Sequence, residues 1–168
     1  VRIRTADFVW SRTFRRLMNR NADLTVADMS AHATVEQYRL FTRYQRSRHT
    51  GGEMSTMAFR DYRAMVEDSP IDTRIIEVRD SKGVLLAAML ADRQLDALSA
   101  VYSMYVPDEE RRSLGTWMVL WMVERAIERE LPFVYLGYWI EQSPKMAYKA
   151  RFRPLEGLGP DGWAVIDL

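Results

Sequence analysis

The chain has 168 residues and a formal net charge of +1; with 48% hydrophobic and 28% charged residues it has the composition of a folded domain, which excludes a disordered protein. Its longest uninterrupted apolar run covers the eight residues 84–91, too few for a membrane-spanning helix, and the lack of cysteine excludes disulfides and thiolate metal ligands. The sequence shows no secretory leader, so we expect a cytoplasmic protein without a membrane partner.

The first predicted elements form a helical part that we place at residues 1–70. Ser11 and Thr34 are residue types that cap helices, and Thr34 is followed by Glu36 and Gln37 as in a capping box. Alternation of apolar and polar residues predicts a strand directly after the first helix. The expected elements are helices over 11–20, 34–48 and 55–66 and a strand over 24–29.

Positive charge is concentrated in this first part. Residues 1–63 carry twelve arginines against six acidic side chains, whereas the remainder of the chain is net acidic. Within the helix expected over 34–48, Arg39 and Arg43 lie on one stripe together with Arg46. Such a stripe is either a solvated face or a surface that binds nucleic-acid phosphates.

From residue 72 the hydrophobic pattern changes to a period of two. Two strands joined by a turn with Gly83 in the left-handed position predict a hairpin, and a long strand follows that places Ser99 and Tyr102 on opposite faces. The next helix is apolar almost all round, so it must be buried on several sides. The expected strands are 74–79, 84–91, 98–106, 133–136 and 163–167, and the expected helices reach Arg129 and cover 143–150.

This order of elements resembles the acyltransferase fold of the N-acetyltransferase (GNAT) type, an α/β (α+β) fold with a mixed, mostly antiparallel sheet flanked by helices. We expect residues 71–168 to form this core, with residues 1–70 packed on it as one compact unit. In that fold the loop before the buried helix presents backbone N–H groups to a phosphate-bearing acyl donor. Arg112 and Gly115 fit the coenzyme A signature of that loop, whereas the bulky Trp117 departs from it and is expected to obstruct a pyrophosphate.

Several motifs resemble one family, the aminoacyl-tRNA–protein transferases. The run 98–108 and the following Ser-Leu-Gly-Thr at 113–116 resemble its C-terminal domain, and the stretches 134–140 and 143–154 nearly reproduce its signature. The motifs at 20–24 and 48–54 resemble upstream motifs of the family. The resemblance covers nearly the whole chain and is greatest to the short bacterial branch, the aspartate/glutamate leucyltransferases.

The chain also departs from the family pattern. Members begin with a cysteine-rich segment that is proposed to hold a metal or an iron–sulfur site, and this chain contains no such segment. We therefore expect no cofactor in this chain. His32 and His49 stand seventeen residues apart without cysteine, so we expect no metal site either.

The resemblance implies transfer of an aminoacyl group from the 3′ end of a tRNA to the α-amine of a protein that begins with Asp or Glu, which marks it for N-degron degradation. The ester is already activated, and an α-amine has a pKa of about 7.7–8.0, so no covalent intermediate and no strong base are needed. The resemblance places an acid near Asp92, our first candidate for holding or deprotonating the acceptor amine. Ser99 and Tyr102 are the other catalytic candidates.

The arginine stripe and the resemblance together give two sets of candidate binding residues. For aminoacyl-tRNA these are Arg112, Ser113, Gly115 and Thr116 in the loop and Arg39 and Arg43 on the helix. For the acceptor protein they form a basic-aromatic cluster whose rings can stack a base and whose cations can meet phosphate or carboxylate. Its members are Tyr135, Gly137, Tyr138, Lys145, Tyr148, Lys149 and Arg151, together with His49.

Alternatives remain open at the level of sequence. The donor amino acid is read by pocket shape, so arginyl transfer is as compatible with these motifs as leucyl transfer. An acetyl-coenzyme A acetyltransferase is a further possibility on this fold. A non-catalytic module that binds tRNA or the acceptor protein is the third, because of the basic first part.

Overall fold

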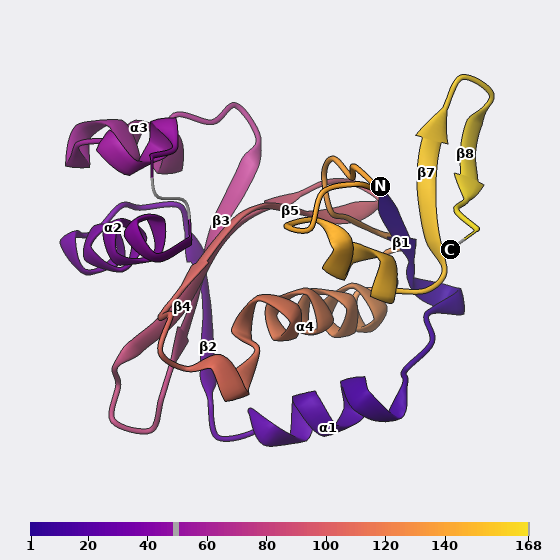
Figure 1. Ribbon diagram of the computed structural model, residues 1–168, viewed down its shortest axis with the longest axis horizontal. Helices are drawn as coiled ribbons and strands as arrows, with labels where there is room; N and C mark the ends of the chain where they lie inside the picture. The colour runs from indigo at the N-terminus through magenta and orange to yellow at the C-terminus, as the bar shows by residue number, and fades with distance from the viewer. Residues whose placement is uncertain (49–50, 168) are drawn as a thin grey trace.

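The computed structural model describes residues 1–48 and 51–167, which form one open sheet with helices on both faces (Figure 1). The sheet has eight strands in the order β2-β3-β4-β5-β6-β1-β7-β8. Neighbouring strands are antiparallel except for β5 and β6, which are parallel, so the predicted mixed α/β fold is confirmed. The strands are β1 (Arg2–Arg4), β2 (Thr25–Ser30), β3 (Asp72–Arg79), β4 (Leu85–Arg93), β5 (Ala97–Tyr105), β6 (Phe133–Tyr135), β7 (Leu155–Gly159) and β8 (Gly162–Val165).

Helices α1 and α4 lie on one face of the sheet, and α2 and α3 lie on the other (Figure 1). The apolar α4 is the central element of the core, because eight of its side chains are buried between the sheet and α1. The helices are α1 (Arg12–Arg20), α2 (Val35–Arg48), α3 (Phe59–Glu67) and α4 (Leu114–Glu128). Short 3-10 helices are η1 (Thr5–Asp7), η2 (Glu53–Thr56), η3 (Glu110–Arg112) and η4 (Ala147–Arg151).

Residues 1–70 contribute strands as well as helices. β1 lies inside the sheet between β6 and β7, although only three residues form it, and β2 forms one edge. The sequence did not predict β1 or β7. A strand of three residues is shorter than a period-two pattern can reveal, and β7 includes Gly157 and Gly159, which sequence propensity assigns to turns.

Two predicted helices are corrected by the structure. The helix expected from Ser55 is divided into η2 and α3, and α3 begins after Ala58, whose N–H donates to the Asp61 carboxylate at 3.0 Å. The helix expected over 143–150 is only the 3-10 turn η4. The hairpin turn is confirmed, with Gly83 at a φ of +79°.

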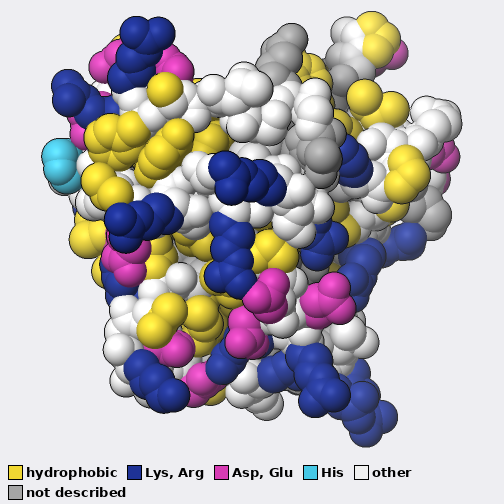
Figure 2. Space-filling model, turned by 60° about the vertical axis from the view of Figure 1, so that its left-hand side comes forward, with side chains coloured by type: hydrophobic (Ala, Val, Ile, Leu, Met, Phe, Trp, Pro, Cys, Tyr) yellow, Lys and Arg dark blue, Asp and Glu magenta, His cyan; other side chains and the backbone are white. Residues whose placement is uncertain are grey.

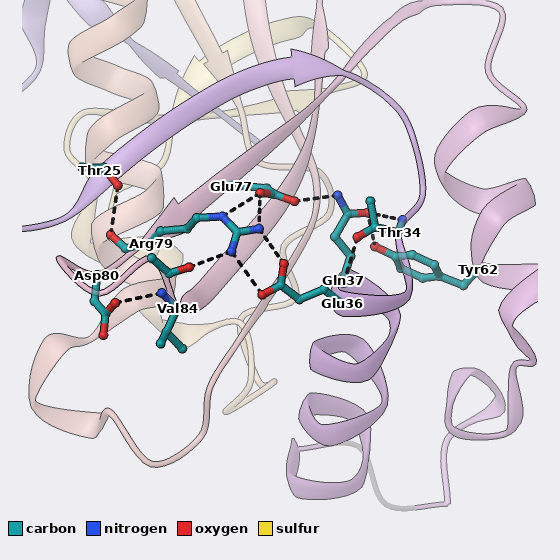
Figure 3. A network of polar contacts seen from close by, with 10 residues as sticks. Thr25, Thr34, Glu36, Gln37, Tyr62, Glu77, Arg79, Asp80 and Val84 are labelled. Carbon is teal, nitrogen blue, oxygen red and sulfur yellow. Dashed lines mark hydrogen bonds and ion pairs between the residues drawn. The ribbon is translucent and has the colours of Figure 1, made fainter.

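A buried polar network joins the start of α2 to β3 (Figure 3). The Gln37 amide donates to the Glu77 carboxylate at 2.8 Å, and both side chains are buried. Arg79 then donates to Glu77 at 2.8 Å and to Glu36 at 2.6 Å. Because each buried polar group here has a partner, the network fixes the position of α2 over the sheet.

A second charged cluster joins β2 to β3, β4 and the end of α4. The Asp28 carboxylate accepts hydrogen bonds from Arg74 at 3.0 Å, Arg93 at 2.6 Å and Arg129 at 3.3 Å. Burial by itself raises the pKa of Asp28, but the hydrogen bonds from Arg74 and Arg93 exceed that effect, and the pKa lies below its ordinary value. The ionised carboxylate is therefore stabilised by folding.

We expect the free energy of unfolding to depend on this carboxylate at low pH. Because the folded pKa is depressed, the stabilisation is complete above the unfolded pKa of about 4 and is lost as the pH falls through the folded value. Asp28→Asn should lower the free energy of unfolding by about 1–3 kcal/mol at pH 7 and should reduce the loss between pH 4 and pH 2. Urea titrations at several pH values measure this; equal acid losses in the wild type and in Asp28→Asn would contradict it.

Candidate active site

A cavity of about 500 Å³ lies where β5 ends and α4 begins. Three segments that are distant in the sequence form its walls: the end of α2, residues 103–116 from the end of β5 to the start of α4, and residues 144–148. We call it the Gly115 cavity. Its lining includes Tyr44, Arg48, Tyr105, Thr116, Lys145 and Tyr148.

The start of α4 presents unpaired backbone donors to this cavity. Ser113 adopts the left-handed conformation with a φ of 45°, and its carbonyl accepts from the N–H of Trp117 at 3.0 Å. The N–H groups of Leu114, Gly115 and Thr116 precede that bond and donate to no acceptor in the described chain. A helix N-terminus with free N–H groups favours a negatively charged oxygen.

Gly115 is required by the packing of Tyr105. A Cβ atom on Gly115 would lie 3.0 Å from Cε1 of Tyr105, closer than side chains normally approach. On its other side the Tyr105 ring stands 4.9 Å from the ring of Tyr44. The Tyr105 ring therefore occupies the space next to Gly115 that a side chain at position 115 would need, and this ring forms part of the cavity wall.

The cavity contains neutral phenols between charges of both signs. Burial raises the pKa of Tyr44 and of Tyr148, so both hydroxyls stay protonated at neutral pH and can donate hydrogen bonds. Among the charged side chains that line the cavity, Arg48 and Lys145 are basic and Glu109 and Glu110 are acidic. The site is thus suited to a ligand that carries both an anionic and a cationic group.

A second cavity, of about 670 Å³, lies beside the end of β6; we call it the Tyr135 cavity. Its lining includes the aromatic side chains of Tyr135, Tyr138, Trp139 and Trp163, and the rings of Tyr135 and Trp163 are 5.7 Å apart. The indole Nε1 of Trp139 is buried and finds no acceptor among the described residues. Gly137, at a φ of +72°, turns the chain away from β6 here.

The wall of the Tyr135 cavity is supported by a buried ion pair. Arg2 on β1 donates to the Glu156 carboxylate on β7 at 2.7 Å, and both side chains are largely buried. The Arg2 guanidinium also lies 4.2 Å from the ring centre of Trp163 and 3.6 Å from that of Phe133. The pair therefore holds aromatic side chains of β6 and β8 in one arrangement.

Both cavities border β5, the Gly115 cavity at Ser103 and Tyr105 and the Tyr135 cavity at Ser99, next to a gap between β5 and β6. These strands pair only from Ala97 to Ser99 with Phe133 to Tyr135, so β5 continues without a strand on that side. The register places Tyr105 on the face that α4 covers and Ser99 on the opposite face, with its partner Tyr135. Residues 137–148 border both cavities.

The prediction that Ser99 and Tyr102 point to opposite faces is wrong. Ala100 is opposite Ala91 and Tyr102 is opposite Leu90, so Val101 is an extra residue that forms a β-bulge. The bulge shifts the alternation by one residue and brings Ser99 and Tyr102 to the same face. A bulge is defined by the pairing with the neighbouring strand, so the hydrophobic pattern of β5 alone gives no signal of it.

Of the three predicted catalytic side chains, Ser99 lines one of the two cavities and the others do not. The Tyr102 hydroxyl lies beneath α2, where it accepts a hydrogen bond from Gln45 at 2.6 Å, and burial raises its pKa to about 12. Asp92 is opposite Ser99 in the sheet and accepts a hydrogen bond from the Thr73 hydroxyl at 2.6 Å.

The predicted tRNA-binding residues fall into two groups. Ser113, Gly115 and Thr116 line the Gly115 cavity. The other three do not: Arg112 forms an ion pair with Asp23 at 2.9 Å, Arg43 is paired with Asp108, and Arg39 is exposed on α2.

The predicted acceptor cluster is also divided by the structure. Tyr135, Gly137 and Tyr138 line the Tyr135 cavity, whereas Lys145 and Tyr148 line the Gly115 cavity. Two further members, Lys149 and Arg151, contact other parts of the protein instead. Lys149 donates to the carbonyls of Leu136 and Tyr138 at 2.6 Å each, and the Arg151 guanidinium lies 5.8 Å from the ring centre of Phe14. His49 is the member outside the described residues.

The expectation for Trp117 is corrected. Its side chain is only 4% exposed and belongs to the core, so the indole does not obstruct the Gly115 cavity. The departure from the coenzyme A signature at this position therefore says nothing about which donor fits. What matters is the side of the helix on which the residue lies: Gly115 faces Tyr105, and Trp117 faces the core.

Sequence reasoning did not identify several side chains of the two cavities. Tyr44 and Arg48 come from α2, Trp139 lies within the motif 134–140 but was given no role, and Trp163 lies outside the motifs. Only the tertiary fold brings these residues to the cavities. Over 1–48 and 51–167, no three His, Asp or Glu side chains gather in a way that could hold a metal ion. Within the same ranges, no helix has the length and apolar composition needed to cross a membrane.

Comparison with known proteins gives one consistent family. Residues 36–159 match the family model of the arginine-tRNA-protein transferase C terminus. The aspartate/glutamate leucyltransferase of Paramagnetospirillum magneticum is 61% identical over 97% of this chain and 67% of its own length. That of Rhodospirillum rubrum is 52% identical over 99% of this chain and 68% of its own length. The chain thus spans about two thirds of these relatives.

Solved structures with the same fold are more distant in sequence. The structure of L-PGS from Bacillus licheniformis has a TM-score of 0.61 at 11% identity and covers 81% of this chain and 43% of that one. The ribosomal-protein-S18-alanine N-acetyltransferase of Escherichia coli has a TM-score of 0.55 at 14% identity and covers 83% of this chain and 88% of that one. These similarities confirm the GNAT-type fold.

Proposed function

This chain belongs to the arginine-tRNA–protein transferase family, and from that premise we propose that it transfers leucine from leucyl-tRNA to the N-terminal amine of proteins that begin with Asp or Glu. That it is an aminoacyltransferase follows from its close relatives. The choice of leucine and of acidic acceptor termini follows the names of these aspartate/glutamate leucyltransferases. Aminoacyl-tRNA is found in the cytoplasm, where we place the reaction and its consequence, entry of the acceptor into N-degron degradation.

The observation that carries the proposal is the pair of cavities that border β5 next to the β5–β6 gap. The Gly115 cavity would hold the tRNA 3′ end, because the free N–H groups at the start of α4 suit an oxyanion and Lys145 suits a phosphate. The donor's α-ammonium group would face Glu109 and Glu110. Tyr148 and Lys145, which the sequence suggested for the acceptor, are accordingly assigned to the donor.

The acceptor would enter the Tyr135 cavity. Its backbone can approach closely at Gly137, and the buried N–H of Trp139 supplies a free donor for a carbonyl or carboxylate oxygen. Tyr135 and Tyr138 line the same cavity and would contact the first side chain of the acceptor. Amine and ester would then meet in the gap, next to Ser99.

The reaction needs little chemistry beyond this positioning. The neutral α-amine attacks the ester carbonyl carbon and forms an amide, and the bond between that carbon and the ribose oxygen breaks. The proton lost from the amine is taken up by the ribose oxygen, which leaves as a hydroxyl group. Ser99 is the candidate for orienting the amine, with Asp92 opposite it in the sheet. Tyr102 has its hydroxyl occupied by Gln45, so its part would be to shape the strand at the bulge.

One assay tests the proposal against its alternatives. Purified protein is given radiolabelled leucyl-tRNA and peptides that begin with Asp, Glu or Lys, with arginyl-tRNA in parallel and an active transferase as the positive control. Leucine on the Asp and Glu peptides alone is the expected result. Arginine incorporation would overturn the donor assignment, and binding of tRNA and peptide without transfer would favour a binding module. Calorimetric binding of acetyl-coenzyme A in the micromolar range would favour an acetyltransferase.

We expect two arginines of α2, Arg39 and Arg43, to differ in their contribution to tRNA binding. Arg39 is exposed without an ion pair in the described chain, whereas Arg43 neutralises Asp108. Arg43→Ala should weaken tRNA binding more than Arg39→Ala, because it also releases a carboxylate, and Asp108→Asn should strengthen binding about twofold to threefold. Filter-binding titrations at constant salt measure all three, and equal effects of both arginines would contradict the pairing argument.

A further inference from the structure

The exposed face of α1 carries arginines that have no partner inside the protein. Phe14 and Leu17 are the buried side chains of this helix, and Arg12, Arg15 and Arg16 lie on the opposite, exposed side. None of these three arginines forms an ion pair within the described chain. Figure 2 shows basic side chains gathered at the lower edge of the molecule, the level at which α1 lies in Figure 1.

This placement of charge destabilises the helix. Arg12 and Arg16 are four residues apart and Arg12 and Arg15 three apart, so the like charges repel each other along one face. Arg12 and Arg15 also lie in the first turn, where the helix dipole favours acidic side chains, and that turn contains none. Helix stability therefore does not explain these arginines, but attraction to a polyanion would.

A groove leads from this helix to the Gly115 cavity. Next to that cavity lies a hollow whose charged lining residues are Arg48, Asp108, Glu109, Glu110 and Arg111. Next to this one lies another, lined by Arg20, Glu109, Arg111 and Arg112, and neighbouring hollows share lining residues. The Arg20 guanidinium at the end of α1 donates to the carbonyl of Arg111 at 2.6 Å. The end of α1 is thus fixed to the loop that begins α4.

The arginines of α2 are a weaker candidate for the same role. Arg43 is paired with Asp108, and Arg46 has a contact within the protein. The α1 face keeps its full charge and borders the groove from its other end. Phosphates spaced along one strand of a nucleic acid match several unpaired arginines along a helix better than a single anionic group does.

We propose that the exposed arginine face of α1, formed by Arg12, Arg15 and Arg16, binds the phosphate backbone of the acceptor stem of the tRNA. The single-stranded 3′ end would follow the groove past Arg111 to the Gly115 cavity. This inference rests on the proposed function, because it takes aminoacyl-tRNA as the donor. It adds the surface that positions the tRNA body, which the motifs of the sequence did not indicate.

The test compares two double variants of equal charge change in the full chain. Arg12→Gln/Arg16→Gln removes two charges from the α1 face, and the control Arg60→Gln/Arg63→Gln removes two exposed arginines from α3, across the sheet. Affinity for leucyl-tRNA and for the uncharged tRNA is measured from about 50 to 200 mM salt. Vesicles of anionic phosphatidylglycerol serve as the second probe, and thermal melting checks the fold.

We expect the α1 variant to bind both forms of tRNA about tenfold more weakly, with a slope of log affinity against log salt that is less steep by roughly 2. The control should stay within about twofold, and the α1 variant should melt no lower than the wild type, because repulsion has been removed. With saturating leucyl-tRNA, its single-turnover rate should equal that of the wild type.

The following outcomes overturn the inference. Equal effects of the two variants would show only a general charge effect, and unchanged tRNA affinity of the α1 variant would exclude the surface. Loss of vesicle binding with intact tRNA binding would assign the face to a membrane instead. If the wild type itself transfers no leucine, the proposed function fails; if the wild type transfers it and the α1 variant keeps its KM for tRNA, only this inference fails.

Discussion

Replacing Gly115 by valine is expected to lower the single-turnover rate of transfer by at least about a hundredfold while tRNA affinity changes by less than about fivefold. A Cβ atom there would stand 3.0 Å from Cε1 and 3.3 Å from the hydroxyl oxygen of Tyr105, so either the ring or the start of α4 must move. Both form the wall of the cavity that we assign to the aminoacyl end. A displacement of about 1 Å in such a site can cost about a hundredfold in rate.

The control for this substitution lies in the β7–β8 hairpin. At Gly159 a new Cβ would meet nothing closer than 3.9 Å, so Gly159→Val makes the same chemical change without a clash and should leave transfer unchanged. Overpacking at Gly115 is also expected to lower the free energy of unfolding by about 1–3 kcal/mol, so the rates are compared well below the melting temperature. Normal transfer by folded Gly115→Val would show that the donor does not use this cavity.

The fold could be predicted largely from the sequence because its long elements have strong periodicity. The hairpin around Gly83 and the buried α4 follow from alternation and from an all-round apolar pattern. The short β1 escaped prediction because its place in the sheet depends on hydrogen bonds to β6 and β7, more than a hundred residues away. The bulge at Val101 escaped for a related reason: it is defined by the partner strand.

The site was less predictable, because residue type alone does not say which way a cation points. Arg112 and Lys149 stand in motif positions, yet the first is tied to Asp23 and the second to two carbonyl groups. Burial lowers the pKa of Lys149, and its ammonium group is held by the loop carbonyls of Leu136 and Tyr138. The arginines of α1 were assigned no role in the sequence, since a solvated face and a phosphate-binding face have the same composition.

Removal of the Glu156 side chain should cause the largest loss of stability. Glu156 is 6% exposed and accepts from Arg2 at 2.7 Å, with Arg4 at 3.4 Å as a second partner. Glu156→Ala leaves the Arg2 guanidinium buried between aromatic rings without its carboxylate, and breaking a buried pair in this way costs about 3–5 kcal/mol. Urea unfolding of both proteins measures the difference.

Two further variants separate the loss of the pair from the loss of a carboxylate in general. Glu128 is half exposed and pairs with Arg125 at the surface, so Glu128→Ala should cost less than about 1 kcal/mol. Glu156→Gln keeps the shape and one acceptor oxygen and should fall between the two. If Glu156→Ala costs no more than Glu128→Ala, Arg2 must reach water when its partner is removed. The rings of Phe133 and Trp163 would then have moved apart, and the Tyr135 cavity would not be the rigid acceptor site that we infer.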